Sequence, residues 1–149
     1  MHFVVGLHNK EVRLYHVDGT LVHTFEGHPG GVIAVAVTAD GQHIISGSDD
    51  NLAKVWSVAS KGLVSTCAGH ADYVRAVAAI PDGQRILTGD DDGTVRVWLL
   101  NGTLENTFEL HTDRVMALVA LPDNQHALSG SVDNTVKLFN VNDLSLIHI

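Results

Sequence analysis

Cysteine is nearly absent from this chain of 149 residues, since Cys67 is its single thiol. A lone cysteine excludes an internal disulfide and is typical of a protein in a reducing compartment. Basic residues are also few: 9 Lys and Arg stand against 17 Asp and Glu, which gives a net charge of −8. No Lys/Arg cluster occurs along the chain, so the basic patch that nucleic-acid binding requires is not expected.

Long apolar runs are missing as well. No stretch approaches the roughly 18 residues that a membrane-spanning helix needs, and residues 1–6 lack the basic segment and apolar core of a signal peptide. Apolar residues nevertheless make up 45% of the sequence and charged residues 17%, a composition typical of a folded chain. We therefore expect a cytoplasmic protein, with a nuclear location also open, and neither membrane nor nucleic acid as a partner.

What the chain contains instead is a repeat. Residues 44–56 read I-I-S-G-S-D-D-N-L-A-K-V-W, residues 86–98 read I-L-T-G-D-D-D-G-T-V-R-V-W, and residues 127–139 read A-L-S-G-S-V-D-N-T-V-K-L-F. Each copy has a short apolar run, a turn of small and acidic residues, and an alternating run that ends on an aromatic ring. Trp56 and Trp98 are 42 residues apart, Trp98 and Phe139 are 41 apart, and a worn copy ends at Tyr15. A fixed period of this length indicates a repeat architecture.

Turn signals such as Asp18-Gly19, Asp40-Gly41 and Pro81-Asp82-Gly83 recur roughly every ten residues, and no segment has a sustained helical period. The sequence therefore predicts an all-β fold in which each repeat forms a four-stranded antiparallel sheet. The inner strand of each sheet, for example residues 32–37 (V-I-A-V-A-V), is apolar enough to be covered on both faces.

Radial repetition of such sheets forms a β-propeller. We expect one domain over residues 1–149 that is a partial propeller of about four blades and fifteen strands. Its predicted parts are a partial blade 1 at 2–26 and blades 2, 3 and 4 at 27–68, 69–109 and 110–149.

A glycine–histidine pair has a fixed place in the repeat. Gly27-His28 and Gly69-His70 precede two inner strands, and Leu110-His111 keeps the histidine without the glycine. Together with the closing aromatic residues, these motifs resemble the WD-repeat β-propeller family, and the resemblance covers essentially the whole chain. The family's Asp after the closing aromatic is absent, because the next residues are Ser57, Leu99 and Asn140.

The resemblance implies a hydrogen-bonded tetrad of His, Ser or Thr, Asp and Trp inside each blade. The members would be His28, Ser46, Asp50 and Trp56 in blade 2, His70, Thr88, Asp92 and Trp98 in blade 3, and His111, Ser129 and Asp133 in blade 4. Phe139 has no indole N–H, so the last network should be one bond short. Such a network stabilises the blade because an orphaned buried polar group costs about 1–3 kcal/mol.

Three chemical interpretations of these residues do not account for the pattern. A Ser-His-Asp triad would explain His28, Ser46 and Asp50, but a structural role explains the same residues in every repeat. Residues 90–93 lack the closing bidentate acid of a calcium loop, and the repeated histidines lack the close His/Cys pairs of a zinc site. We therefore expect no catalytic residue, no metal and no cofactor. The alternative is a propeller enzyme or small-ligand binder that uses the central channel.

The resemblance also implies where partners bind. Propellers of this family bind peptides or domains with the narrow top face, through positions three and five after the repeat histidine and one before the tetrad Asp. The expected partner-binding residues are Ile33, Asp49, Tyr73, Arg75, Asp91, Arg114 and Met116. Arg75 and Arg114 on adjacent blades, flanked by Tyr73, would suit an acidic or phosphorylated peptide. We therefore expect a protein-interaction scaffold, with ordinary solvated loop residues or a purely structural repeat as the alternatives.

About four blades are fewer than the roughly seven with which this family usually closes its ring. An open arc would expose two blade faces, which costs on the order of 10 kcal/mol per face. We therefore expect either a piece of a longer protein or a chain that self-associates, as a homodimer or within a larger complex. The candidate contacts are Phe3, Val4, Val12 and Leu14 at one end and Val115, Leu118 and Leu146 at the other.

Overall fold

The computed structural model of the chain describes residues 1–143 and 145–147. Within these residues the backbone forms fifteen strands and no helix. This part of the chain accordingly holds no helix that is long and apolar enough to cross a bilayer. The last predicted strand, at 144–149, is observed as the short β15 (Leu146–Ile147), and positions 144, 148 and 149 lie outside the described residues.

The strands form four antiparallel sheets, which we call blades 1 to 4. Blade 1 holds β1 (His2–Gly6), β2 (Glu11–His16) and β3 (Leu21–Glu26). Blade 2 holds β4 (Val32–Val37), β5 (His43–Ser48), β6 (Leu52–Ser57) and β7 (Leu63–Ala68). Blade 3 holds β8 (Val74–Ala79), β9 (Arg85–Asp90), β10 (Thr94–Leu99) and β11 (Leu104–Glu109). Blade 4 holds β12 (Val115–Ala120), β13 (His126–Ser131), β14 (Val136–Asn140) and β15.

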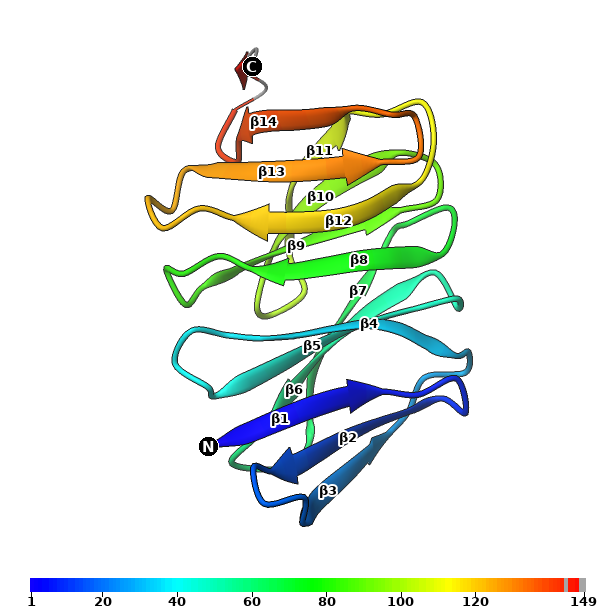
Figure 1. The fold of residues 1–149 in the computed structure, drawn as a ribbon, viewed down its shortest axis with the longest axis vertical. Helices are drawn as coiled ribbons and strands as arrows, with labels where there is room; N and C mark the ends of the chain where they lie inside the picture. Colours follow the sequence, from blue (N-terminus) through cyan, green and yellow to red (C-terminus); the bar gives the residue numbers. More distant parts are fainter. Residues whose placement is uncertain (144, 148–149) are drawn as a thin grey trace.

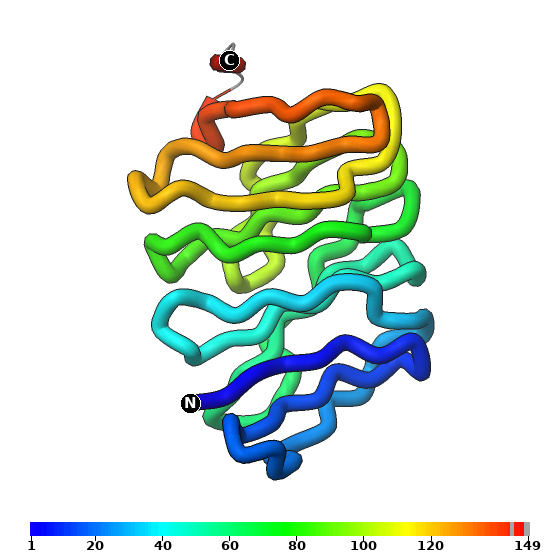
Figure 2. Tube along the Cα trace, in the orientation of Figure 1, coloured from blue at the N-terminus to red at the C-terminus, as the bar shows by residue number. Residues whose placement is uncertain are grey.

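The blades follow one another along the long axis of the molecule, so that the two chain ends lie at opposite ends of the arc (Figures 1 and 2). Within blades 2 to 4 each strand pairs with its sequence neighbour, from an inner strand (β4, β8, β12) to an outer one. Blade 1 begins at the position of a second strand. The prediction of an all-β partial propeller of antiparallel blades is confirmed.

Tight turns between strands are closed by local hydrogen bonds. At Asp18 the carboxylate accepts the Thr20 N–H at 2.8 Å, and Gly19 adopts a φ of 91° that a side chain would disfavour. At Asp40 the carboxylate likewise accepts the Gln42 N–H at 2.9 Å. Turn chemistry that can be read from the sequence therefore fixes where each hairpin folds back.

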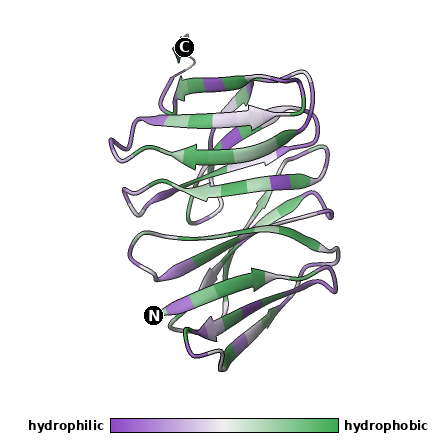
Figure 3. Ribbon diagram, viewed as in Figure 1, coloured by the Kyte–Doolittle hydropathy of each residue, from purple (hydrophilic) through white to green (hydrophobic). Residues whose placement is uncertain are grey.

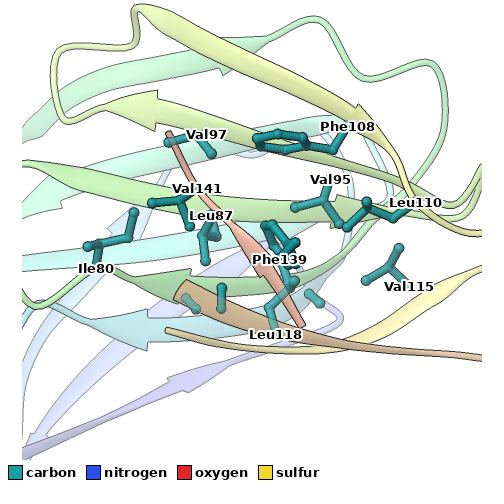
Figure 4. Close-up of a cluster of buried hydrophobic side chains, with 13 residues drawn as sticks. Ile80, Leu87, Val95, Val97, Phe108, Leu110, Val115, Leu118, Phe139 and Val141 are labelled. Atoms are coloured by element: carbon teal, nitrogen blue, oxygen red, sulfur yellow. The ribbon is translucent and has the colours of Figure 1, made fainter. Parts of the chain in front are cut away.

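Three apolar clusters lie between successive blades. The one between blades 1 and 2 includes Val12, Phe25 and Trp56, and the one between blades 2 and 3 includes Ile45 and Trp98. The third cluster, between blades 3 and 4, surrounds Phe139 (Figure 4). Burial of each such side chain contributes about 1.5–3 kcal/mol, so the interfaces between blades form the core of the molecule.

One glycine in each of β1, β5 and β9 sets how closely the next blade approaches. A Cβ built on Gly6 would lie 2.6 Å from Val32 Cγ1, and one on Gly89 would lie 2.6 Å from Val115 Cγ1. Gly47 meets Val74 in the same way, at 2.8 Å. The inner strand of each following blade thus places its first valine where only a glycine leaves room.

The inner strands are less covered than the sequence predicted. They are rich in apolar residues (Figure 3), yet Val37 of β4 and Met116 and Val119 of β12 are exposed. The prediction of strands covered on both faces is therefore wrong for half of β12 and for the end of β4, whereas no residue of β8 is exposed. An inner strand has one edge without a neighbouring strand, and in the described part of the chain no sheet packs on the far face of blade 4.

We expect the Gly89→Val substitution to lower the free energy of unfolding by about 1–3 kcal/mol, because the added side chain collides with Val115. The matched Gly130→Val substitution should change it by less than about 0.5 kcal/mol, because among the described residues the nearest atom to a Cβ there is Ala117 Cβ at 3.9 Å. Urea unfolding followed by tryptophan fluorescence measures both. Equal losses in the two variants would contradict this account of blade packing.

Candidate functional site

The repeat histidine of blade 2 joins four side chains into one network. His28 Nδ1 lies 2.7 Å from Asp50 Oδ2, and His28 Nε2 lies 2.7 Å from Ser46 Oγ. The Trp56 indole N–H donates to the same hydroxyl oxygen at 2.8 Å. A carboxylate can only accept, so Nδ1 carries the proton, Nε2 accepts from the Ser46 hydroxyl, and that hydroxyl accepts from Trp56. Every polar atom in this network has a partner.

Blade 4 repeats the network with one member fewer. His111 Nδ1 lies 2.8 Å from Asp133 Oδ2, and His111 Nε2 lies 2.7 Å from Ser129 Oγ. Phe139 occupies the place of the tryptophan and packs in the core without donating a hydrogen bond. Thr135 Oγ1, 3.0 Å from His111 Nδ1, is an additional neighbour that has no counterpart in blade 2.

In blade 3 the structure corrects the residue assigned to the network. His70 Nδ1 lies 2.6 Å from Asp90 Oδ2, whereas the repeat alignment predicted Asp92, which is exposed in the turn. Blades 2 and 4 have Ser48 and Ser131 at the place of Asp90. The longer carboxylate of Asp90 reaches His70, and its other oxygen accepts the N–H groups of Asp92 and Thr94 at 3.1 and 3.0 Å.

The rest of the blade 3 network is as predicted in composition. Thr88 Oγ1 lies 2.5 Å from His70 Nε2 and accepts the Trp98 indole N–H at 2.8 Å. Arg96, which the sequence did not single out, donates to Asp90 Oδ2 at 3.1 Å. A sequence signal for this position does exist: a basic residue stands two positions before the closing aromatic residue in each of these blades. Lys54 and Lys137 occupy the places equivalent to Arg96.

Burial and hydrogen bonding shift the pKa values of these groups. Burial lowers the pKa of His28 and of His70, and the neighbouring carboxylates offset only part of that effect. For Asp90 burial acts to raise the pKa, but the hydrogen bonds from His70 and Thr94 and the charge of Arg96 outweigh it and leave the pKa lowered. The blade 3 network therefore holds a neutral histidine beside an ionised aspartate.

This arrangement has the residue types of a catalytic triad but offers no access to a substrate. The hydroxyl groups of Ser46, Thr88 and Ser129 belong to fully buried residues. Among residues 1–143 and 145–147 no group of three or more His, Cys, Asp or Glu side chains is placed to hold a metal ion. Cys67 is also buried, and burial raises the pKa of its thiol to about 12, so it is present as the unreactive thiol.

A shallow, open polar pocket of about 570 Å³ lies between blades 3 and 4, at the ends of the sheets remote from the tetrad turns. It is lined by residues that include Asp82, Arg85, Glu105 and Asn142. The Arg85 guanidinium is already engaged, since it donates to Asp82, to Asn142 and to the Asn124 carbonyl at 2.6–2.8 Å. These bonds tie the two blades together. Arg85 therefore acts as a structural bridge and leaves no free cation for a ligand.

The predicted top-face positions meet at the end of the blades where the inner strands begin. The N–H of Asp49 donates to the Gly31 carbonyl at 3.1 Å, and the N–H of Asp91 donates to the Tyr73 carbonyl at 3.1 Å. In blade 4 the N–H of Val132 donates to the Arg114 carbonyl at 3.0 Å. Residues that are 18 positions apart in the chain are thus fixed next to one another by backbone bonds.

A charged cluster connects two of these blades. Arg75 donates to both carboxylate oxygens of Asp91, with Nη2 to Oδ2 at 2.7 Å. Arg114 Nε lies 3.5 Å from the same carboxylate, and its side chain is 56% exposed. Tyr73 and Met116 beside them are exposed. We call Tyr73, Arg75, Asp91, Arg114 and Met116 the top patch.

Two predicted partner-binding residues stand apart from this cluster. Ile33 and Asp49 are half-buried in blade 2, and neither takes part in the ion pairs of the top patch. The sequence pattern had placed the two arginines as free partners for a ligand. The geometry differs, because Asp91 already occupies Arg75 and leaves Arg114 as the more available cation.

Comparison with known families agrees with this architecture. The family model described as WD domain, G-beta repeat (WD40) matches residues 19–57, 61–98 and 102–140, which is most of the chain. The chain belongs to the WD40 repeat family. Each match runs from the outer strand of one blade to the third strand of the next, so the WD40 sequence repeat is offset from the structural blade by one strand.

Several curated proteins share parts of this WD40 sequence. The vegetative incompatibility protein HET-E-1 of Podospora anserina is 54% identical over 37 residues, which is 25% of this chain and 3% of that protein. The SIR4-interacting protein SIF2 of Saccharomyces cerevisiae is 35% identical over 57 residues, 38% of this chain and 11% of that protein. The target of rapamycin complex subunit wat1 of Schizosaccharomyces pombe is 36% identical over 59 residues, 38% of this chain and 19% of that protein.

The chain thus spans less than a fifth of the length of each of these three relatives. The similarity to these relatives lies within the WD40 repeats, whose family model matches three stretches of this chain.

The corrected network can be tested in blade 3. We expect Asp90→Asn to lower the free energy of unfolding by about 2–4 kcal/mol, because it removes a buried charge that pairs with Arg96 and accepts from His70. Asp92→Asn, a matched change of an exposed residue two positions away, should alter stability by less than about 0.5 kcal/mol. Thermal or urea unfolding compares the two variants. The opposite ranking would restore the assignment made from the repeat alignment.

Proposed function

We propose that this WD40 segment is a non-catalytic scaffold that binds partner proteins through the top patch. The observation that carries the proposal is the ion-paired cluster of Arg75, Asp91 and Arg114, which joins blades 3 and 4 beside two exposed side chains, Tyr73 and Met116. Tyr and Arg are enriched at binding hot spots, and Met adapts to partners of varied shape. The names of two relatives, a SIR4-interacting protein and a subunit of a target of rapamycin complex, describe proteins that act with other proteins and support this choice.

The charges of the top patch favour an acidic ligand group. The hydrogen bonds to Asp91 raise the pKa of Arg75 and hold its guanidinium in one orientation. Arg114 has a single, longer contact with the same carboxylate and is mostly exposed. A carboxylate or phosphate of a partner can therefore pair with Arg114 while an adjacent apolar side chain contacts Tyr73 and Met116.

We expect Arg114→Glu to weaken the binding of short synthetic peptides that carry a glutamate or phosphoserine next to a leucine by at least about tenfold, because it reverses the available charge. Lys61→Glu makes the same charge change in an exposed turn at the opposite end of blade 2 and should leave binding unchanged. Fluorescence anisotropy with labelled peptides measures the affinities. Equal affinities in the two variants would remove the top patch as the binding site.

We also propose that two copies associate through the ends of the arc. Ala53 and Val95 are 0% exposed in blades 2 and 3, whereas Val136 at the equivalent place in blade 4 is 59% exposed. At the opposite end of the arc Phe3 and Tyr15 stack with their ring centroids 5.2 Å apart. In the other blades the residues at these two positions pack on the preceding blade. The end of one copy is therefore complementary to the beginning of another.

This assignment changes the contact residues expected from the sequence. Val12 and Leu14 are buried against blade 2, and Val115 and Leu118 are buried against blade 3. They belong to interfaces within the chain, and so they are unavailable for a contact between copies. Alternation along each strand puts Phe3 and Val136, not these residues, on the two outer faces.

Light scattering behind a sizing column should give a mass of about 32 kDa, twice the 16.0 kDa of one chain. Val136→Glu places a charge in the proposed contact and should return the mass to that of a single folded chain. Leu63→Glu, at an exposed apolar residue in the outer strand of blade 2, is a control for added charge. A monomeric wild-type protein with a cooperative unfolding transition would exclude the association.

A further inference from the structure

Blades 2 and 3 each carry an aspartate at the same place of the top face, but only one of the two is paired. Asp91 of blade 3 accepts two hydrogen bonds from Arg75, and Arg114 Nε lies 3.5 Å from the same carboxylate. Asp49 is its counterpart in blade 2 and is half-buried. Within residues 1–143 and 145–147 its carboxylate has neither an ion pair nor a hydrogen bond.

The two positions that supply the arginines in blade 3 hold uncharged residues around the blade 2 carboxylate. Ile33 stands where Arg75 stands, five residues after the repeat histidine of its blade. Tyr73 stands where Arg114 stands, three residues after the histidine of the following blade. Blade 2 therefore keeps the acceptor and lacks both donors.

Two contacts across the boundary between blades 2 and 3 place Asp49 beside Tyr73. Two positions before Asp49, a Cβ built on Gly47 would lie 2.8 Å from Val74 Cγ1. Two positions after Asp49, the Asn51 side-chain amide donates at 3.3 Å to the carbonyl that lies two positions before Tyr73. One repeat later the equivalent pair of residues forms the ion pair between blades 3 and 4.

The loop before β4 leaves room at the Asp49 carboxylate. A Cβ on Gly30 would collide with Asp49 Oδ1, and one on Gly31 would lie 3.3 Å from Asp49 Oδ2 and 2.9 Å from His8 Nδ1. The carboxylate thus lies over two glycines, with the exposed His8 on one side and Tyr73 on the other. The loops of blades 3 and 4 carry longer side chains at the two glycine positions: Asp72 and Tyr73, Asp113 and Arg114.

A half-buried carboxylate in this setting favours a cation from outside the chain. Burial removes part of its hydration, and a hydrogen-bonded opposite charge compensates for that loss better than water at the surface does. A guanidinium fits best, because its planar fork pairs with both carboxylate oxygens and its face stacks on an aromatic ring. Arg75 shows the first of these two contacts on the equivalent carboxylate of blade 3.

We propose that the Asp49 carboxylate and the Tyr73 ring together bind an arginine side chain of a partner polypeptide. The guanidinium pairs with Asp49 and lies on the exposed face of Tyr73. This binding role rests on the function proposed above, because it assigns a basic group of the partner to the face whose Arg114 takes an acidic group. The partner is then a polypeptide that carries both charges.

The probe is a short labelled peptide with one arginine beside a leucine and no acidic residue. Its matched control replaces the arginine with citrulline, which keeps the shape and loses the charge. Fluorescence anisotropy with the full 149-residue chain measures both affinities. We expect the citrulline peptide and the Asp49→Asn protein each to lower the affinity at least about fivefold. Together the two changes should lower it no further, since they remove one interaction from its two sides.

Asp92→Asn is the control for charge. It removes the same charge from an exposed turn of the same face one repeat later and should leave the affinity unchanged. The control matters because a chain with a net charge of −8 attracts any basic peptide. In NMR spectra the peptide should shift the amide signals of Gly30 and Gly31 and leave that of Gly102, in a turn at the opposite end of blade 3, unchanged.

Equal affinities of the arginine and citrulline peptides for the wild type would overturn the proposal. So would equal losses in Asp49→Asn and Asp92→Asn, or the absence of saturable binding. None of these results removes the top patch, because acidic peptides and Arg114→Glu decide that function separately. If Asp49→Asn weakens the arginine peptide while Arg114→Glu leaves acidic peptides unaffected, the arginine site stands and the acidic-ligand role of Arg114 is the part that fails.

Discussion

Close approach of successive sheets is the constraint on which the rest of this structure depends. The first valine of each inner strand fits against a glycine of the preceding blade, at a distance that no Cβ would permit. This contact brings the broad apolar faces of two sheets together, and the valines that make it belong to the three core clusters. A single blade has no core of its own, because each sheet buries its face only against the next one.

The buried tetrads fix a different part of each blade. They link the loop before the inner strand to the second and third strands, so the turns at the top of the sheet are held by charge-assisted hydrogen bonds and not by apolar packing. The top patch is built on these turns. Arg75, Asp91 and Arg114 can form a shared cluster because two adjacent blades each hold their loops in a defined place.

Equivalent positions of the repeat differ in burial when no further blade packs beside them. Val95 is buried against blade 4, whereas Val136, one repeat later, is exposed. Chemistry and local structure are nearly the same at the two places, so the difference in burial comes from the presence or absence of the next sheet.

The sequence by itself determined the elements and their order. Alternating apolar residues, turn pairs such as Asp40-Gly41 and the period of 41 to 42 residues are local or periodic signals, and strands form where they predict. The histidine and hydroxyl members of the tetrads were predictable too, because they recur in register. Features that recur in every repeat could therefore be predicted from the sequence alone.

Tertiary structure alone decided the contacts that depend on reach and on neighbours. Alignment selected Asp92 for the third tetrad, but Asp90 extends to His70 because a carboxylate replaces a serine there. It left Arg75 free, yet Asp91 of the same blade binds it at both oxygens. The sequence also offered Val12 and Leu118 as contacts at the outer ends of the arc. The alternation of side chains along each strand instead turns both residues toward the neighbouring blade within the chain. Sequence position fixes which strand a residue lies on, whereas its partner depends on the sheet that packs beside it.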